Sequence, residues 1–332
     1  METYKIPGTE LEPSRIALGT WAIGGRQWGG TDDAQAIRTI HAAIDRGITL
    51  IDTAPAYGFG HSEEVVGKAI AEIGQRDRLT IATKVGLEWG DGIQGVVRNS
   101  TPARIEKEVD DSLRRLGVDA IDLYQVHWPD PKAPMEDTAR TMERLYRDGK
   151  IRAIGVSNFS PEQCDAFREV APLHAVQPPL NLFERDAERS IIPYAKRDGL
   201  AMLTYGALCR GLLTGKMHRD YGFSGDDLRN NDPKFQQPRF DQYLAAVEAL
   251  DRFAQERHGK RVLELAVRWL LDRNANGIAL WGARRPDQVD PVERIADWTL
   301  SYEEIEEIER IVDEHVQDPV GPEFMAPPTR DV

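Results

Sequence analysis

The chain repeats one pattern eight times: a short run of mostly apolar residues, several of them β-branched, precedes a longer stretch with helical periodicity. The short runs occupy residues 15–23, 49–54, 79–85, 121–127, 153–158, 175–182, 201–208 and 277–283. Such alternation is typical of βα units with parallel strands. Eight successive units predict an α/β fold, a (β/α)8 TIM barrel whose strands all end at one face.

Residues that begin and end helices support this prediction. Thr31 and two following aspartates precede the first helix, and a proline lies near the first turn of helices that begin close to residues 102 and 161. Glycines are expected to end five helices in a left-handed backbone conformation. These glycines are Gly47, Gly74, Gly117, Gly149 and Gly199.

We expect residues 1–332 to form a single barrel domain. The segment at 18–25 lacks the Gly-x-Gly-x-x-Gly pattern of a doubly wound dinucleotide-binding sheet. Residues 3–14 are predicted to form a hairpin that plugs the bottom of the barrel. The stretch 209–241, rich in Gly, Asp, Asn and Pro, is predicted to be a functional loop over the active face. A last helix near 301–315 and a tail at 323–332 follow the eighth unit.

Composition narrows the possible functions. The net charge of −13 disfavours nonspecific binding to nucleic acids or anionic membranes. The two cysteines, Cys164 and Cys209, form no metal-binding spacing, so no metal site is expected. The N-terminus lacks the apolar segment of a signal peptide, and no run approaches the length of a membrane span. We therefore expect a cytoplasmic protein, either a monomer or a homo-oligomer, with small-molecule partners.

Four residues near the ends of three consecutive predicted strands predict catalysis. Asp52 and Tyr57 follow the second strand, Lys84 ends the third and His127 ends the fourth. Singly, such residues are most often helix caps, rim residues or solvated side chains, but together they are placed to converge at one face. An ammonium next to a phenol lowers the pKa of the phenol, and a carboxylate can hold that ammonium in place. We expect Tyr57 to protonate a carbonyl oxygen, Lys84 to tune it, Asp52 to orient Lys84, and His127 to donate to the oxygen or relay the proton.

A second set of residues suits a dinucleotide. Ser157, Asn158 and Gln177 have donors and acceptors that fit a carboxamide, and Tyr205 offers a flat face for a nicotinamide ring. The segment 205–216 supplies backbone N–H groups and two cations for a pyrophosphate.

Two arginines are expected at the other end of the dinucleotide. Arg284 and Arg285 lie at a predicted helix N-terminus, where an additional ribose phosphate would be favoured. This favours NADP(H) over NAD(H), which stays possible, while the arginine pair could also be a solvated helix start.

The chain resembles the aldo-keto reductase superfamily, and its long loop after the seventh strand is similar to the bacterial branch. The similar segments are LGTW (18–21), GITLIDTAPAYGFGHSEEVVGKAI (47–70), ATKVG (82–86), DLYQVHWPDP (122–131), GKIRAIGVSNF (149–159), LTYGALCRGLLTGK and GARRPDQ. The resemblance implies a barrel that binds extended NADP(H) across the strand ends, with the four catalytic roles given above. The residues it places at the cofactor are Thr20, Trp21, Asp52, Ser157, Asn158, Gln177, Tyr205, Gly206, Leu208, Arg210, Gly211, Leu213, Gly215, Lys216, Gly282, Arg284 and Gln288.

Two departures from the family pattern concern the cofactor. The Glu-Asn pair that contacts adenine in the family is replaced by Pro291 and Val292, so that recognition is looser or comes from Asp287 or Asp290. The family's Ile-Pro-Gly before the phosphate loop is replaced by Leu-Trp-Gly at 280–282, which is expected to reshape the cofactor cleft.

We therefore predict an NADP(H)-dependent oxidoreductase that reduces aldehydes or ketones, including sugar-like carbonyls, to alcohols. The predicted substrate pocket is walled by Trp21, Tyr57, Trp89, His127 and Trp128, with mobile loops after the third and seventh strands. One alternative is an NAD(P)-dependent dehydrogenase that oxidises a sugar or an alcohol. A minor alternative is a non-catalytic, cofactor-binding auxiliary subunit.

Overall fold

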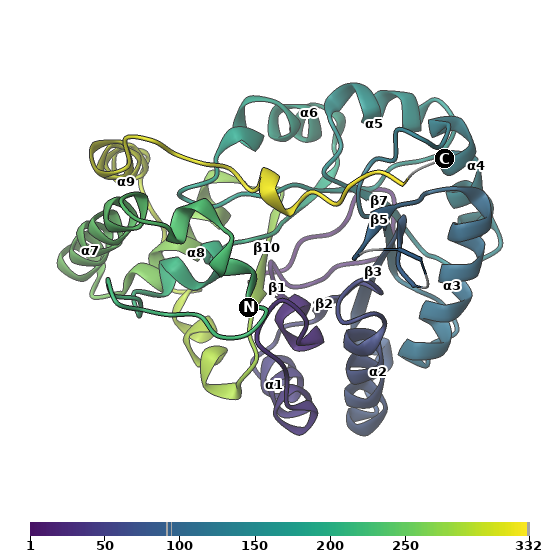
Figure 1. The fold of residues 1–332 in the computed structure, drawn as a ribbon, viewed down its shortest axis with the longest axis horizontal. Coiled ribbons are helices and arrows are strands. Elements are labelled where there is room, and N and C mark those ends of the chain that lie inside the picture. The colour runs from purple at the N-terminus through teal and green to yellow at the C-terminus, as the bar shows by residue number, and fades with distance from the viewer. Residues whose placement is uncertain (91, 94, 331–332) are drawn as a thin grey trace.

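A closed barrel of eight parallel strands forms the centre of the molecule in the computed structural model, which describes residues 1–90, 92–93 and 95–330 (Figure 1). Around the barrel the strand order is β1-β10-β9-β8-β7-β6-β3-β2. The strands are β1 (Ile16–Gly19), β2 (Leu50–Asp52), β3 (Thr80–Val85), β6 (Leu123–Val126), β7 (Ile154–Ser157), β8 (Ala175–Gln177), β9 (Ala201–Thr204) and β10 (Gly277–Gly282). Each lies within its predicted run, and the predicted TIM barrel is confirmed.

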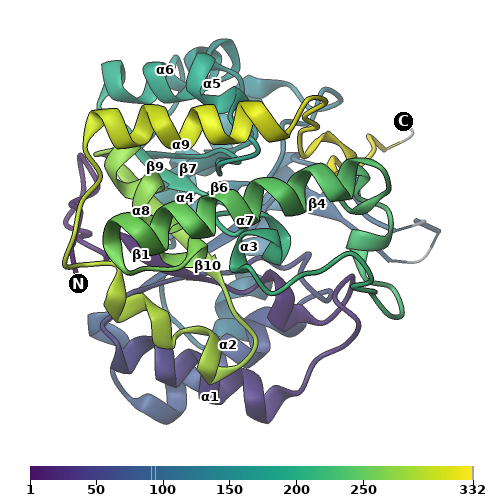
Figure 2. The same cartoon turned by 90° about the vertical axis from the view of Figure 1, so that its left-hand side faces the viewer.

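Helices surround the barrel and cover the outer faces of its strands. They are α1 (Asp33–Asp45), α2 (His61–Ile73), α3 (Pro102–Leu116), α4 (Met135–Arg147), α5 (Pro161–Arg168), α6 (Ile191–Asp198), α7 (Arg239–His258), α8 (Val262–Arg273) and α9 (Tyr302–His315). Outside the barrel, α7 packs against both α8 and α9 (Figure 2). None of the helices within the described ranges combines the length and the apolar content that a bilayer span requires.

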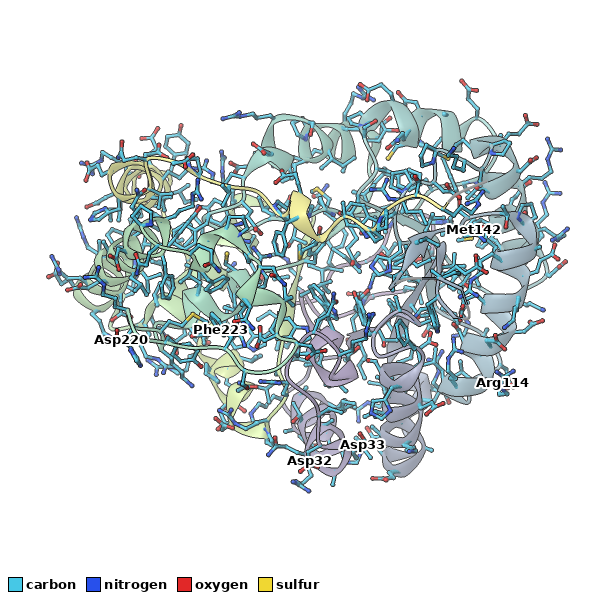
Figure 3. All side chains as sticks on the ribbon, viewed as in Figure 1. Asp32, Asp33, Arg114, Met142, Asp220 and Phe223 are labelled. Carbon is cyan, nitrogen blue, oxygen red and sulfur yellow. The ribbon has the colours of Figure 1, made fainter. Side chains whose placement is uncertain are left out.

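The predicted helix ends are confirmed by local contacts. Asp32 accepts a hydrogen bond from the backbone N–H of Gln35 at 2.9 Å and caps α1, which begins at Asp33 (Figure 3). Prolines occupy the first turns of α3 and α5. All five predicted glycine positions adopt positive φ, between 62° and 84°.

A hairpin at the N-terminus closes the bottom of the barrel. Its two arms are joined by hydrogen bonds from Tyr4 N to Pro13 O at 2.9 Å and from Ile6 N to Leu11 O at 2.8 Å. Ile6 is fully buried in a cluster of small and apolar side chains from the barrel strands, including Ala17 and Leu50. The predicted plug is therefore confirmed, and the opposite end of the barrel is left for the site.

Irregular segments shape the face at the C-terminal ends of the strands. Two short antiparallel strands, β4 (Leu87–Glu88) and β5 (Val97–Arg98), follow β3. The nine 3-10 helices of the described residues are η1 (Trp21–Gly24), η2 (Arg76–Arg78), η3 (Asp186–Arg189), η4 (Cys209–Thr214), η5 (Leu228–Asn230), η6 (Pro233–Phe235), η7 (Pro286–Gln288), η8 (Asp290–Arg294) and η9 (Glu323–Met325). Of these, η1, η4, η5, η7 and η9 contribute residues to this face, whereas η2 precedes β3 at the opposite end of the barrel. The C-terminal segment after α9 runs back across the barrel toward α4 (Figure 1).

Candidate active site

A cavity of about 600 Å³ opens where the barrel strands end. Most of the residues expected at the site line it, but Lys84, Trp89, Leu213, Gly215 and Lys216 do not. The expected residues on its walls are Thr20, Trp21, Asp52, Tyr57, His127, Trp128, Ser157, Asn158, Gln177, Tyr205, Gly206, Leu208, Arg210, Gly211, Gly282, Arg284 and Gln288. The cavity therefore joins the expected catalytic group to the expected cofactor-binding residues.

Asp52, Lys84 and Tyr57 form one hydrogen-bonded chain at the base of this cavity. The Lys84 ammonium, fully buried, donates to Asp52 Oδ2 at 2.5 Å and to the backbone carbonyl of Thr53 at 3.0 Å. It also lies 3.3 Å from the hydroxyl of Tyr57. The Tyr57 ring lies between Trp21 and His127, with ring centroids 6.0 Å and 5.8 Å away. The structure thus brings the four predicted catalytic residues together.

Two glutamines hold the carboxylate of Asp52 from the other side. Gln125 and Gln177 each donate a hydrogen bond from the side-chain amide to Asp52 Oδ1, at 3.1 Å and 2.9 Å. Gln177 also donates to the amide oxygen of Gln125 at 3.1 Å. Sequence analysis missed Gln125, although its position opposite Lys84 in the β3–β6 pairing could have pointed to it. A buried carboxylate needs such partners, and these hold Asp52 toward Lys84.

The loop that carries Tyr57 is fixed by close backbone packing. A Cβ atom at Gly24 would lie 2.6 Å from the carbonyl carbon of Tyr57, and one at Gly58 would lie 2.3 Å from the carbonyl oxygen of Gly24. Gly58 also has a φ of +68°, which favours glycine. The glycines of this loop and of η1 therefore let the two backbones meet, which places the phenol beside Trp21.

The surroundings set the protonation state of each group. Removal from water raises the pKa of Tyr57 more than the adjacent Lys84 ammonium lowers it, so the net shift is upward. The expected effect of Lys84 therefore has the predicted sign but does not dominate. Burial alone would lower the pKa of Lys84, but the Asp52 carboxylate and the Tyr57 hydroxyl together outweigh it, and the pKa is raised.

His127 shifts in the opposite direction. Removal from water, and then the nearby Lys84 charge, hold the pKa of His127 well below its usual value. At neutral pH the site therefore holds a protonated phenol, an ammonium and a neutral imidazole, which suits proton donation to a developing alkoxide.

The expected carboxamide-binding residues form a connected group beside this chain. Asn158, at a φ of +61°, donates to the backbone carbonyl of His127 at 3.0 Å. The hydroxyl of Tyr205 donates to the side-chain oxygen of Asn158 at 2.8 Å. Ser157 donates to the backbone carbonyl of Gln177 at 2.8 Å. Because amides, a hydroxyl and an aromatic ring line one side of the cavity, this donor set fits a nicotinamide group.

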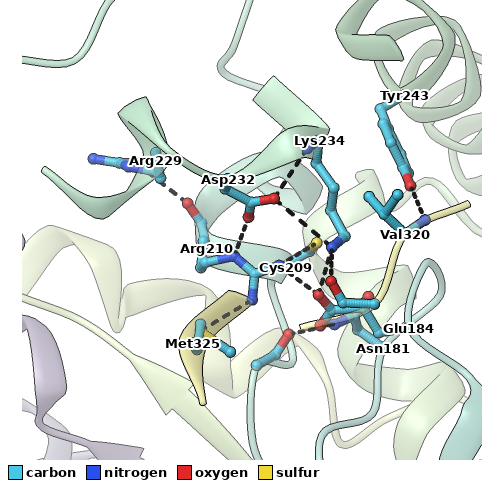
Figure 4. A network of polar contacts seen from close by, with 12 residues as sticks. Asn181, Glu184, Cys209, Arg210, Arg229, Asp232, Lys234, Tyr243, Val320 and Met325 are labelled. Atoms are coloured by element: carbon cyan, nitrogen blue, oxygen red, sulfur yellow. Dashed lines mark hydrogen bonds and ion pairs between the residues drawn. The ribbon is translucent and has the colours of Figure 1, made fainter. Parts of the chain in front are cut away.

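The contacts of Arg210 differ from the expectation. Its guanidinium is 4% exposed and forms ion pairs with Glu184 and, at 2.6 Å, with Asp232 (Figure 4). Lys234, fully buried, binds the same Glu184 at 2.8 Å. The cation expected to face a pyrophosphate is thus taken up by two carboxylates. Any contribution of this segment to a phosphate would come from the backbone, which takes positive φ from Cys209 to Gly211.

The expected adenosine end is also partly occupied by internal contacts. Arg284 lines the cavity and donates from Nη1 to the backbone carbonyl of Trp28 at 2.7 Å. The proposed substitutes for adenine recognition are engaged elsewhere, because Asp287 pairs with Arg285 at 3.0 Å and Asp290 pairs with Arg46. Val292 is 1% exposed in the core. Of this group, Arg284 is therefore the cation best placed toward a cofactor.

Two loops meet over the cavity. Asp226 accepts backbone hydrogen bonds from Gln27 at 2.8 Å and Gly29 at 3.1 Å, and the Arg229 guanidinium lies 5.2 Å from the ring of Trp28. Residues 209–241 thus lie over the active face as predicted. Trp28 was missed, although a tryptophan within the glycine-rich segment 24–30 was a usable signal.

The C-terminal segment forms the other wall, which the sequence did not predict. Residues 324–328 line the cavity, and Arg98 donates from Nε to the backbone carbonyl of Pro327 at 2.8 Å. Trp89 is not at this wall, because it stacks on Phe59 with centroids 5.3 Å apart. The loop expected to be mobile after the third strand includes residues 91 and 94, which lie outside the described residues.

We find no candidate metal site in the part of the chain that the structure describes. No group of three or more His, Cys, Asp or Glu side chains there is placed to hold a metal ion.

Comparison with known proteins supports one family. The model of the Aldo/keto reductase family matches residues 15–313. The chain is 60% identical to the aldo-keto reductase YhdN of Bacillus subtilis (strain 168), covering 100% of this chain and 99% of that protein. It is 35% identical to the NADH-specific methylglyoxal reductase of Escherichia coli (strain K12), covering 93% of this chain and 100% of that protein.

Among solved structures, the chain superposes on the glycerol dehydrogenase AKR11B4 from Gluconobacter oxydans with a TM-score of 0.88. The two are 57% identical, with 98% of this chain and 99% of that chain covered. The barrel, the hydrogen-bonded Asp-Lys-Tyr chain at its mouth and these matches lead to one conclusion: the chain belongs to the aldo/keto reductase family of oxidoreductases.

Proposed function

We propose that this enzyme reduces aldehydes and ketones to alcohols with NADP(H), using Tyr57 as the proton donor. The observation that carries the proposal is the hydroxyl of Tyr57 lying 3.3 Å from the ammonium of Lys84 at the base of the cavity. A phenol so placed can give its proton to a carbonyl oxygen while the ammonium stabilises the phenolate that remains.

The chain's own residues divide the remaining work. Asp52 holds Lys84 charged and in place, and the neutral His127 can donate a ring N–H to the same carbonyl oxygen. Ser157, Asn158 and Gln177 would bind the carboxamide of the cofactor, and Tyr205 would pack on its ring. The bound cofactor supplies the hydride that reaches the carbonyl carbon.

The substrate class follows from the walls of the cavity. Trp21, Trp128, Phe324 and Met325 present aromatic and apolar surface to the same cavity as Tyr57 and His127. Such walls favour neutral aldehydes, ketones and sugar-like carbonyls over multiply charged acids.

Arg284 is the basis for proposing NADP(H). Its guanidinium is half-buried at the cavity wall, where its forked donors could bind a ribose phosphate. The 35% identical relative is named as NADH-specific, so the opposite preference is the alternative to test.

A second candidate function is the oxidation of an alcohol or sugar. The 57% identical neighbour is titled a glycerol dehydrogenase, and a phenol–ammonium pair can accept a proton as well as donate one. The same residues would then run in the opposite direction, with NADP or NAD as the oxidant.

One panel of assays tests these proposals. The purified enzyme is given aldehydes, ketones and open-chain sugars with NADPH or NADH, and glycerol and other polyols with NADP+ or NAD+, while nicotinamide absorbance is followed. We expect the highest kcat/KM for an uncharged carbonyl with NADPH. Faster polyol oxidation would favour the dehydrogenase, and no turnover in either direction would favour the auxiliary subunit. We also propose a cytoplasmic location, which fractionation of expressing cells would test.

A further inference from the structure

Glu63 is a fully buried carboxylate behind the catalytic residues, and the proposed mechanism gives it no role. It lies in the first turn of α2, six residues after Tyr57. It lies on the outer side of the barrel and is not among the residues that line the cavity. A buried carboxylate is unfavourable unless it is paired and hydrogen-bonded, so its contacts need a reason.

Those contacts join three elements. Thr83, the residue before Lys84 on β3, donates its hydroxyl to Glu63 Oε1 at 2.6 Å. Arg115, at the end of α3, donates from Nε to Glu63 Oε2 at 2.6 Å. Because successive side chains of a strand point to opposite faces, Thr83 binds Glu63 behind the sheet while Lys84 faces the site. Glu63 is thus linked to Lys84 through one residue of β3.

The same pair also holds the loop that carries Tyr57. A Cβ atom at Gly60 would lie 2.9 Å from Cδ of Arg115, so the arginine stem packs directly against this loop. The backbone of Tyr57 continues into α2 through a hydrogen bond from Ser62 N to Tyr57 O at 3.1 Å. On one side Glu63 therefore restrains the lysine strand, and on the other it restrains the tyrosine loop.

We propose that Glu63, paired with Arg115, is a positioning residue that sets the separation between the Tyr57 hydroxyl and the Lys84 ammonium. The inference rests on the proposed role of Tyr57 as proton donor. Glu63 touches no reacting atom and acts through the placement of β3 against the start of α2.

The separation matters because the two groups interact electrostatically at short range. Lengthening the 3.3 Å distance by about 1 Å would weaken their Coulomb attraction by about a quarter. Less stabilisation of the phenolate makes Tyr57 a weaker acid.

The titratable groups that face Tyr57 are Lys84 of β3, Asp52 of β2, His127 after β6 and Tyr205 after β9. The charged and titratable groups around Glu63 are Arg115, Glu108 and Arg104 of α3 and Tyr124 of β6.

Two variants test the proposal independently. Glu63→Gln keeps the shape of the side chain but removes its charge, and Thr83→Val removes only the hydroxyl that binds it. For each we measure carbonyl-reduction kcat against pH at saturating NADPH, the NADPH Kd by tryptophan fluorescence, and Tm. We expect kcat at pH 7 to fall about tenfold and the alkaline limb of the profile to move up by about one pH unit. We expect the NADPH Kd to stay within about twofold of wild type.

Asp122→Asn is the matched control. Asp122 is another buried carboxylate, which accepts from the backbone N–H of Ile81 at 2.7 Å near the other end of β3 and pairs with Arg76 and Arg152. This control should lower Tm while leaving the alkaline limb in place. If both test variants keep the wild-type limb, or if Asp122→Asn moves it equally, Glu63 is only structural. Tyr57→Phe is measured in the same assays. Near-normal turnover of Tyr57→Phe would contradict the proposed function itself. If Tyr57→Phe is inactive but Glu63→Gln keeps the alkaline limb of the wild-type pH profile, only the positioning role of Glu63 is contradicted.

Discussion

Replacing Glu184 by Gln should destabilise the protein strongly. Glu184 accepts hydrogen bonds from Arg210, from Lys234 at 2.8 Å and from the side chain of Asn181 at 2.7 Å, all within a buried cluster (Figure 4). Without its charge, two buried cations would share the single carboxylate of Asp232. Removing one partner of a buried ion pair typically costs about 3–5 kcal/mol, because the remaining charge is uncompensated.

That free energy converts into a measurable change in Tm. Globular proteins gain about 2.1 cal/mol/K of unfolding entropy per residue, so 332 residues give about 0.7 kcal/mol/K. A loss of about 3–5 kcal/mol should therefore lower Tm by about 4–7 °C. The control is Glu10→Gln, which breaks an ion pair with Lys5 whose side chains are 96% and 55% exposed, and exposed pairs contribute at most about 1 kcal/mol.

The pH dependence gives a second check on the same variant. Burial alone would raise the pKa of Glu184, but Arg210 and Lys234 outweigh it and lower the pKa below its usual value. Its charge therefore stabilises the fold above the unfolded-state pKa near 4.5, and this contribution is lost as pH falls through the lower folded-state value. Calorimetry of the wild type and of Glu184→Gln should show a difference in the free energy of unfolding that is constant from about pH 6 to 8 and shrinks below about pH 4.5. A Tm within about 1 °C of wild type at pH 7 would refute the reasoning.

Three further predictions concern the site. Because the pKa of His127 is held well below its usual value, the pH profile of kcat for reduction should show no transition near pH 6.5. A transition at that pH that disappears in His127→Phe would contradict this. Arg284→Gln should raise the Kd of NADPH at least tenfold and leave that of NADH nearly unchanged, as measured by fluorescence titration, and equal effects on both would exclude a phosphate contact. Truncation after Pro322 removes the cavity wall at 324–328 and should raise the substrate KM about tenfold in steady-state assays, whereas an unchanged KM would show that this wall does not touch the substrate.

The regular part of the fold was predictable because it depends on local pattern. Each strand was marked by its apolar run and most helix ends by a cap or a glycine, and parallel βα units leave little choice of topology. The predicted strands extended too far at their C-terminal ends. Thr20, Trp21 and Tyr205 are residue types that favour strands, yet the chain turns out of the barrel at these positions and they line the cavity. Strand propensity does not distinguish these positions.

The convergence of Asp52, Tyr57, Lys84 and His127 was predictable because these residues lie at fixed places relative to the strands. The remaining site depends on contacts between distant segments. Arg210 looked like a free cation in a glycine-rich loop, and its partners Glu184 and Asp232 lie 26 and 22 residues away with no local sign of pairing. The wall at 324–328 carries apolar residues without periodicity, and its place over the cavity depends on Arg98, in a hairpin 229 residues earlier.

The central claim is that the phenol of Tyr57 gives the proton, and pre-steady-state kinetics of Tyr57→Phe tests it most directly. Enzyme preloaded with NADPH is mixed with a carbonyl substrate, and the absorbance loss of the first turnover is recorded for the variant and the wild type. We expect the variant to bind NADPH with wild-type affinity and to transfer hydride at least 10²-fold more slowly, the usual range for loss of a general acid being about 10²–10⁴-fold. A first turnover within about threefold of wild type would contradict the claim.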